Sequence, residues 1–330
     1  MAARTLALGV IGVGSLGYHH ARILRTLPGV TLAGICDTDS DRLHAVATEL
    51  DAAPFQNAAD LLDRVEAVVV AVPTTHHEEV ARSALDRGIH VLIEKPIAPT
   101  LDAADRILEA AEASGALVQI GHVERFNGAL RACEPYLDEP LFVESHRLAP
   151  FGPRGTDVAV VLDLMIHDLD LVLSLMRRDV VDIAAVGVPV LTTSPDIANA
   201  RLQFEGGGVA NLTASRVSVE RMRRIRFFQR SGYLSLDLAV GRGDFYRLKA
   251  GATLTPGVPF AATSLSDIVE RIPIESDGVE PLRRELESFV AALNGEAPVV
   301  VTGQDGRRAL GVALDIIDRI EQHVAHTHPA

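Results

Sequence analysis

The tripeptide Glu94-Lys95-Pro96 directly follows the apolar run Val91-Leu92-Ile93. A continuous apolar run predicts a buried parallel strand, and ligands of open parallel sheets bind beyond the carboxyl ends of the strands. A lysine at that edge faces the crevice, where its cation can stabilise negative charge, and the ring of Pro96 fixes the backbone behind it. Taken alone, Lys95 is more readily explained as a solvated strand end, because lysine is rarely buried without a partner.

A second group of reactive side chains lies on a helix predicted over residues 160–176. Because positions three and four apart share one face of a helix, Asp163, His167 and Asp170 are expected on one side. A histidine between carboxylates is a candidate general base, since its pKa lies near neutral pH. A packing role for His167 is the alternative when the helix is considered by itself.

The motif Gly12-x-Gly14-x-x-Gly17 lies between a predicted strand and a predicted helix. Its glycines permit a tight turn, close approach of the backbone to a pyrophosphate and close helix packing, so the motif predicts a dinucleotide site. Asp37 ends the second strand about 20 residues later, where a carboxylate binds ribose hydroxyls and repels a 2′-phosphate. NAD is therefore favoured over NADP, although Arg42 could stack on adenine or pair with a 2′-phosphate.

Further polar residues follow the predicted strands. The loop from Val72 to His77 is expected to contact the cofactor, with helix capping as the alternative for His77. The predicted cofactor-binding residues are Gly12, Gly14, Ser15, Leu16, Gly17, Asp37, Arg42, Val72, Pro73, Thr75, His77, Glu94 and Lys95.

The segment 121–127 begins at the end of the fifth strand, and Arg147 and Arg154 flank a glycine and proline loop that is either an anion clamp or a solvated loop. The predicted substrate-binding residues are His122, Arg125, Asn127, Arg147, Arg154, Asp163 and His167.

Alternating strand and helix patterns predict an α/β protein with two domains. Residues 1–122 are expected to form a Rossmann domain with a parallel sheet, and residues 123–330 an α+β domain with a mainly antiparallel, open-faced sheet. The first helix is predicted from the helical spacing of Leu16, His20, Ile23, Leu24 and Leu27, and two later helices from residues 282–293 and 306–323. Strands are predicted over residues 7–12, 31–36, 67–72, 89–93, 116–120, 141–146, 183–190, 200–204, 208–215, 224–229 and 233–238.

The composition narrows the class of protein. A net charge of −13 disfavours nucleic acid as a partner, and no apolar run is long enough to span a membrane. The two cysteines, Cys36 and Cys133, lack a second ligand at zinc-binding spacing, so neither a disulfide framework nor a metal site is expected. The N-terminal apolar stretch carries the glycine motif and not a cleavage site, which predicts a cytoplasmic protein.

These motifs together resemble the Gfo/Idh/MocA oxidoreductases over the whole chain. The resemblance implies that Lys95 and His167 flank a sugar hydroxyl that is oxidised and that Asp163 binds or orients the substrate. One departure is Met165, where the family often has glycine between the aspartate and the histidine; it predicts a bulkier wall beside an otherwise retained site.

Two stretches, residues 121–127 and 157–168, resemble the UDP-sugar 3-dehydrogenases of this family. They imply oxidation of the 3-hydroxyl of UDP-N-acetylglucosamine or its uronate, with Arg147 and Arg154 near the diphosphate. The alternatives are an inositol or free-sugar dehydrogenase and, from another class, a dinucleotide-binding sensor without catalysis. The open sheet face predicts a homodimer or homotetramer.

Overall fold

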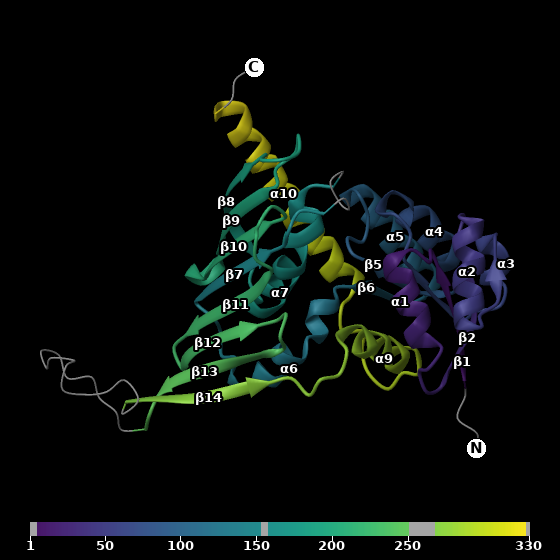
Figure 1. Ribbon diagram of the computed structural model, residues 1–330, viewed down its shortest axis with the longest axis horizontal. Helices are drawn as coiled ribbons and strands as arrows, with labels where there is room; N and C mark the ends of the chain where they lie inside the picture. Colours follow the sequence, from purple (N-terminus) through teal and green to yellow (C-terminus); the bar gives the residue numbers. More distant parts are fainter. Residues whose placement is uncertain (1–4, 153–157, 251–267, 328–330) are drawn as a thin grey trace, which may run out of the picture. The chain divides into compact units, whose positions relative to one another are not determined.

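Figure 1 shows a computed structural model, which describes residues 5–152, 158–250 and 268–327. The chain divides into a first unit, Met1–Val123 with Pro281–Gly311, and a second unit, Glu124–Glu280 with Val312–Ala330. The segment Pro281–Gly311 therefore returns to the first unit after the chain has formed most of the second.

The apolar runs of the N-terminal region form a six-stranded parallel sheet. Its central strands are buried apart from the partly exposed Ala7 and His90, as their unbroken apolar sequences predict. The order is β3 (Pro54–Phe55), β2 (Val30–Cys36), β1 (Leu6–Ile11), β4 (Ala67–Val70), β5 (His90–Glu94) and β6 (Val118–Gly121).

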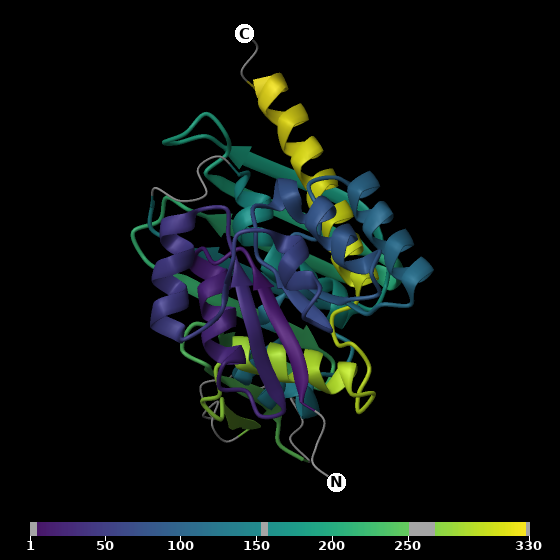
Figure 2. The ribbon, with the colours of Figure 1, turned by 90° about the vertical axis from the view of Figure 1, so that its right-hand side faces the viewer.

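Helices cover both faces of this sheet (Figure 2). One group packs against β1 in a single core that includes Leu24, Leu43 and Phe289: α1 (Ser15–Leu24), α2 (Ser40–Leu50) and α9 (Pro281–Leu293). The other group comprises α3 (Ala58–Leu62), α4 (His77–Leu85) and α5 (Leu101–Ser114). The Thr100 hydroxyl accepts a hydrogen bond from the Ala103 N–H at 3.2 Å and caps α5.

The second unit contains an eight-stranded sheet in which only β7 and β10 pair in parallel. The prediction of a mainly antiparallel sheet is confirmed, and β13 and β14 extend it beyond the predicted strands. Its order in Figure 1 is β14 (Val269–Glu275), β13 (Arg242–Leu248), β12 (Gly232–Asp237), β11 (Met222–Gln229), β7 (Phe142–Leu148), β10 (Val209–Ser215), β9 (Ile197–Phe204) and β8 (Val180–Val188).

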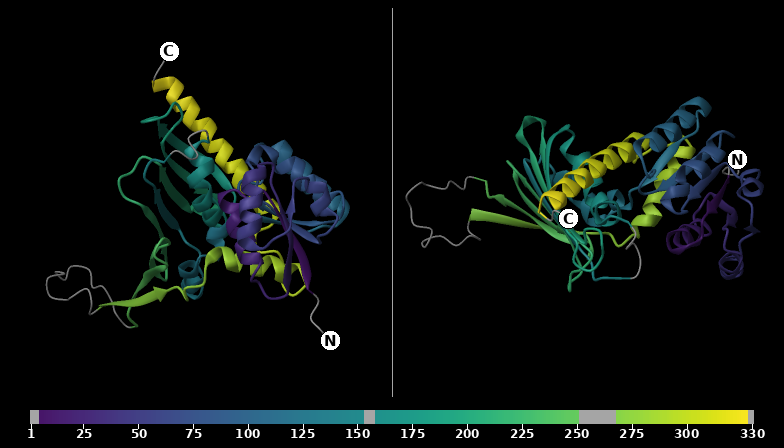
Figure 3. Two further views of the ribbon diagram at one scale, coloured as in Figure 1. Left: turned by 45° about the vertical axis from the view of Figure 1, so that its right-hand side comes forward. Right: turned by 90° about the horizontal axis from the view of Figure 1, so that it is seen from above.

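One face of this sheet carries the helices of the second unit (Figures 1 and 3). They are α6 (Gly128–Cys133), α7 (Ile166–Met176) and the part of α10 (Gly303–Thr327) that follows Gly311. Residues along β7 and β9 alternate between buried and more exposed positions, as a sheet with one covered face requires. The predicted helix over 160–176 begins differently, with a π-helix over Val161–Met165 before α7.

Two further expectations concern the cysteines and the membrane. Cys36 and Cys133 are buried free thiols, and burial raises the pKa of Cys36 to about 11. Among the described residues, the helices are too short or too polar to pass through a lipid bilayer.

The position of α9 predicts the effect of truncating Phe289. This ring is completely buried in the core around β1, so Phe289→Ala should lower the free energy of unfolding by about 3–5 kcal/mol. Urea denaturation measures the loss. The matched control is Phe151→Ala, because Phe151 is 46% exposed and should cost less than about 1 kcal/mol. Equal effects of the two substitutions would contradict this position of α9.

Candidate active site

The glycine motif forms a turn that only glycine can build. Gly12 has a φ of 87°, and a Cβ there would lie 2.7 Å from the Ala71 carbonyl oxygen. A Cβ on Gly17 would lie 1.7 Å from the Gly12 carbonyl oxygen. The turn after β1 and the close packing of α1 against it therefore both depend on the absence of side chains.

Gly14 differs from the other two glycines because it faces open space. A Cβ on Gly14 would have a single neighbour within 4 Å, the Arg42 Nη1 at 3.9 Å. Gly14 is also the N-cap of α1, and no side chain caps this helix. The N-terminus of α1 thus offers backbone N–H groups and a positive dipole end to an anion.

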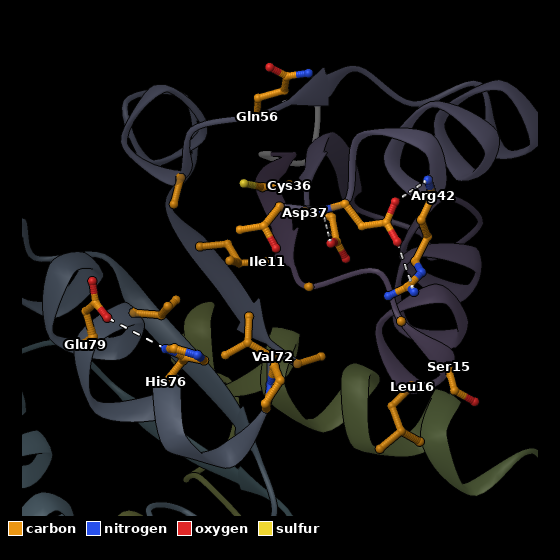
Figure 4. A pocket seen from close by; sticks show the side chains of 18 residues that line it. Ile11, Ser15, Leu16, Cys36, Asp37, Arg42, Gln56, Val72, His76 and Glu79 are labelled. Carbon is orange, nitrogen blue, oxygen red and sulfur yellow. Dashed lines mark hydrogen bonds and ion pairs between the residues drawn. The ribbon is translucent and has the colours of Figure 1, made fainter. Parts of the chain in front are cut away.

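A cavity of about 740 Å³ lies against this turn (Figure 4). Its walls come from the β1–α1 turn, the end of β2, α2, and the loop that follows β4. The lining residues are Ile11, Gly12, Gly14, Ser15, Leu16, Cys36, Asp37, Thr38, Asp39, Arg42, Gln56, Ala58, Ala71, Val72, Pro73, His76, Glu79 and Val80.

Asp37 connects the end of β2 to the glycine turn. One carboxylate oxygen accepts a hydrogen bond from the Val13 N–H at 2.8 Å, and the other accepts from the Asp39 N–H at 2.9 Å. A carboxylate has about four acceptor positions, so capacity for ribose hydroxyls is retained. Arg42 is half-exposed and lies 3.1 Å from the Asp39 carboxylate, which reduces the positive charge that it could offer to a 2′-phosphate.

The cavity has the features that a nicotinamide dinucleotide requires. A turn without side chains and an uncapped helix N-terminus suit the pyrophosphate, and a carboxylate at the end of β2 suits the adenosine ribose. The charge of Asp37 and the pairing of Arg42 favour NAD over NADP.

The loop after β4 contributes only part of its predicted residues to the cavity. Val72 and Pro73 line it, whereas Thr75 is exposed beside it. His77 is 1% exposed and its two ring nitrogens each lie 2.9 Å from a carbonyl oxygen, one of Val72 and one of Pro96. Burial lowers the pKa of His77. The contacts of His77 therefore connect the loop after β4 to the loop after β5, and they do not support the predicted cofactor contact.

Glu94 and Pro96 hold the backbone of Lys95 on both sides. Glu94 ends β5 and is buried; one of its carboxylate oxygens lies 2.7 Å from the His20 Nε2, and the other accepts the Lys95 N–H at 3.2 Å. Pro96 is buried and contacts His77 through its carbonyl oxygen. Lys95 itself is half-buried. Glu94 thus fixes the Lys95 backbone and does not line the cavity, which differs from the cofactor contact that the sequence predicts.

In the second unit, the helical segment that carries His167 also carries Asp163 and Asp170, which differ in their exposure. Asp163, in the π-helix, and His167, in α7, are half-buried. Asp170 is 1% exposed and forms a bidentate ion pair with Arg125, with both N–O distances at 2.7 Å. Asp170 follows His167 by three residues in α7, and its carboxylate is engaged by Arg125 inside the unit. The single π turn changes the helical register at Asp163, a feature that often marks functional sites.

Arg147 lies in the interior of the second unit. It is 3% exposed and donates hydrogen bonds to Asp168, the shortest at 2.6 Å, and to Glu124 at 3.0 Å. Burial opposes the charge of this guanidinium, but the two carboxylates raise its pKa above the ordinary value. Its donors are directed to these carboxylates, so its position does not suit the diphosphate contact that the sequence predicts.

Other predicted substrate-binding residues also hold the fold. The Asn127 side chain caps α6 and donates to Glu124 and to the Leu238 carbonyl oxygen, while Arg125 binds Asp170. His122 is buried beyond β6. Arg154 lies outside the described residues. Of the predicted set in the described chain, Asp163, His167 and Arg125 are partly exposed, and the guanidinium of Arg125 is engaged by Asp170.

Met165 is 1% exposed, so it packs inside the second unit. The predicted bulkier wall beside the substrate is therefore not formed by an exposed methionine.

Two family models cover most of the chain. Residues 6–122 match the model described as "Oxidoreductase family, NAD-binding Rossmann fold", and residues 119–235 match the "GFO/IDH/MocA C-terminal domain". The UDP-N-acetylglucosamine 3-dehydrogenase of Acidithiobacillus ferrooxidans is 38% identical over 95% of this chain and 96% of its own length. The chain belongs to the Gfo/Idh/MocA oxidoreductases. The first unit of this oxidoreductase is its NAD-binding domain.

Solved structures and further relatives agree with this membership. A structure of the A. ferrooxidans enzyme matches with a TM-score of 0.88 and 37% identity, covering 96% of this chain and 98% of that one. Inositol 2-dehydrogenase 2 of Saccharopolyspora erythraea is 34% identical over 94% of this chain and 91% of its own length. A scyllo-inositol dehydrogenase from Lactobacillus casei, solved with NAD(H), shares the fold with a TM-score of 0.78 and 20% identity.

Sequence reasoning missed two residues beneath Lys95, His20 and Glu285. The sequence does contain a signal for both residues, because each polar side chain lies on the apolar face of its helix. His20 shares the spacing of Ile23 and Leu24 in α1, and Glu285 stands between Leu282 and Phe289 in α9. A polar residue on a buried stripe requires a polar partner.

The contrast between the glycines of this oxidoreductase gives a test of the cofactor site. Gly14→Ala should leave the melting temperature nearly unchanged, because its Cβ meets only a flexible guanidinium. The same methyl group would occupy space beside the helix N-terminus and should weaken NAD binding at least tenfold.

Isothermal titration with NAD and a thermal melt measure the two effects. Gly12→Ala is the control and should behave in the opposite way. This substitution should lower the melting temperature, because Gly12 has a positive φ and its new Cβ would lie 2.7 Å from the Ala71 carbonyl oxygen. Unchanged NAD affinity in folded Gly14→Ala would contradict the placement of the pyrophosphate.

Proposed function

We propose that this oxidoreductase uses NAD to oxidise the 3-hydroxyl of UDP-N-acetylglucosamine, or of its uronate, to the 3-keto sugar nucleotide. The observation that carries the proposal is the similarity to the A. ferrooxidans UDP-N-acetylglucosamine 3-dehydrogenase over nearly the whole of both chains. Lys95, Asp163 and His167, the three residues that the family resemblance assigns to catalysis, are all present.

The reaction removes a hydride from a carbinol carbon and a proton from its oxygen. NAD accepts the hydride when it is bound. His167 takes the hydroxyl proton as general base, and the cation of Lys95 stabilises the negative charge that develops on the oxygen. Asp163 binds a neighbouring hydroxyl or orients the sugar. One alcohol thus gives one ketone, one reduced nicotinamide and one released proton.

The contributions can be ranked by size. Alignment of the reacting carbon supplies up to about 7–11 kcal/mol of the barrier in well-ordered sites. General base catalysis adds a factor of about 10²–10⁴, which is equivalent to about 3–5 kcal/mol. Positioning is therefore the larger effect, and the fixed backbone of Lys95 serves it.

The diphosphate of the substrate requires a local cation, because the net charge of the chain is −13. With Arg147 and Arg125 engaged by carboxylates, Arg154 is the residue of the predicted set that we assign to this role. We also propose a cytoplasmic enzyme that assembles as a dimer or tetramer through the open face of the second sheet.

A second candidate is oxidation of an inositol or a free sugar, favoured by the similarity to the S. erythraea inositol 2-dehydrogenase. A panel of UDP-sugars, free sugars and inositols, followed by NADH absorbance, separates the two. UDP should protect only a UDP-sugar enzyme against thermal unfolding, by about 2.7 kcal/mol at a hundredfold its Kd. A flat trace with every compound, while NAD still binds, would favour a non-catalytic sensor.

The assigned roles predict the kinetics of two variants. Lys95→Met and His167→Gln should each lower kcat on UDP-N-acetylglucosamine about 10²–10⁴-fold, since each removes a group that acts only as the carbonyl forms. The Kd for NAD should change less than threefold. Steady-state kinetics and NAD titration measure both quantities.

The chain supplies matched controls for both variants. Lys249 is the only other lysine in the sequence and is exposed, and His146 lies on β7 at a position that alternates with the buried residues. Lys249→Met and His146→Gln should retain activity within about threefold. Retained turnover in both Lys95→Met and His167→Gln would refute the assignment.

A further inference from the structure

Three ionisable side chains from separate elements meet beneath Lys95 in the first unit. His20 comes from α1, Glu94 from the end of β5, and Glu285 from α9. One nitrogen or oxygen atom of each lies within 4.8 Å of those of the other two. The exposed fractions of the three residues are 0%, 7% and 0%, so no charge in this group is solvated.

Two of the three already form a complete interaction. The His20 Nε2 lies 2.7 Å from one oxygen of Glu94, and the other oxygen of Glu94 accepts the Lys95 N–H. Burial would raise the pKa of Glu94, but His20 and Lys95 hold it below the ordinary value. Glu94 is therefore the ionised carboxylate of the group.

Glu285 stands in a different situation. Both of its carboxyl oxygens are buried without a hydrogen-bond partner among the described residues. The Gln119 side chain donates to the backbone carbonyl of Glu285, at 3.2 Å, and not to its carboxyl group. The titratable groups within 4.8 Å of it are His20 on α1 and Glu94 at the end of β5. Lys95 and His77 on α4 interact with the charge of Glu94 and are its next neighbours in charge.

An ionised Glu285 would place a second negative charge beside Glu94, where both carboxyl groups are buried. Two buried carboxylates at this separation cannot both remain charged, because each disfavours the ionisation of the other. Burial and the charge of Glu94 accordingly raise the pKa of Glu285 well above the ordinary value. A neutral carboxyl group adds no charge beside Glu94 and His20, which lie within 4.8 Å of it.

We propose that Glu285 is a buried carboxylic acid that stays protonated beside the ionised Glu94, and that the group of His20, Glu94 and Glu285 positions Lys95. The two carboxyl groups then carry one negative charge between them, and Glu94 keeps its contacts with His20 and the Lys95 N–H. The role of Lys95 in catalysis rests on the proposed function, whereas the protonation of Glu285 does not.

A divalent cation is the other occupant that one nitrogen and two carboxylates could accept. The direct contact between His20 and Glu94 favours the proton, because an ion bound to both would have to replace that hydrogen bond. Metal analysis of the purified protein separates the two. One tightly bound metal ion per chain that is lost in Glu285→Gln would overturn the proposal.

Infrared spectroscopy tests the protonation of Glu285 without reference to catalysis. At neutral pH, the wild-type protein should show the C=O stretching band of a carboxylic acid, and Glu285→Gln should lack it. Glu287→Gln, on the exposed side of the same helix, is the matched control and should retain the band. Absence of the band from the wild type at neutral pH would overturn the proposal.

The pH dependence of stability gives a second test. Folded Glu285 retains a proton that the unfolded chain releases above the ordinary carboxyl pKa. Stability is therefore lost as pH rises from that pKa towards the folded one. Relative to Glu285→Gln, whose amide is always neutral, the folding equilibrium constant of the wild type should fall about tenfold per pH unit in this window. Denaturation of both proteins between pH 4 and pH 9 measures it, and parallel curves would overturn the proposal.

A kinetic readout connects the group to Lys95. Ionisation of Glu285 at alkaline pH should disturb Glu94, so the wild-type kcat should fall there, and Glu285→Gln should move this alkaline limb by at least one pH unit. An unmoved limb would overturn the positioning role. If no hydroxyl substrate is turned over at any pH, the proposed function fails, and the infrared and stability results still decide the protonation of Glu285.

Discussion

The contact between α1 and the turn after β1 fixes most of what the first unit can do. Because Gly12 and Gly17 lack side chains, the helix begins directly against the strand, and its N-terminus opens onto the cavity. One turn further along the same helix, His20 reaches Glu94 at 2.7 Å. A single close approach of backbone to backbone thus builds the anion site for the cofactor and also supports the strand end that carries Lys95.

The buried charged side chains of the second unit mainly stabilise its fold. Arg125 and Arg147 are paired with Asp170, Asp168 and Glu124, and such buried pairs cost several kcal/mol when one partner is removed. Because these carboxylates engage both guanidinium groups, we assign neither arginine to substrate binding. Asp163 and His167 lie beside this framework on the helix that it anchors, where a rigid support favours catalysis.

Sequence patterns predicted the features that depend on local chemistry. The glycine turn, Asp37 and the buried strands follow from spacing and apolar runs, and the structure places them accordingly. Pairing choices were not predictable, because an arginine has the same sequence signature whether it meets a phosphate or an aspartate, as Arg147 illustrates. The return of α9 to the first unit was also hidden, since an amphipathic helix does not specify which sheet it covers.

The central claim is that one hydride passes from C3 of a UDP-linked amino sugar to NAD. UDP-N-acetylglucosamine labelled with deuterium at C3 tests it most directly, with the reduced nicotinamide analysed by mass spectrometry after turnover. Deuterium should be recovered in the reduced nicotinamide, and the sugar product should be a 3-ketone without the label. Reduced nicotinamide that carries no deuterium, or a labelled sugar returned unchanged, would contradict the account.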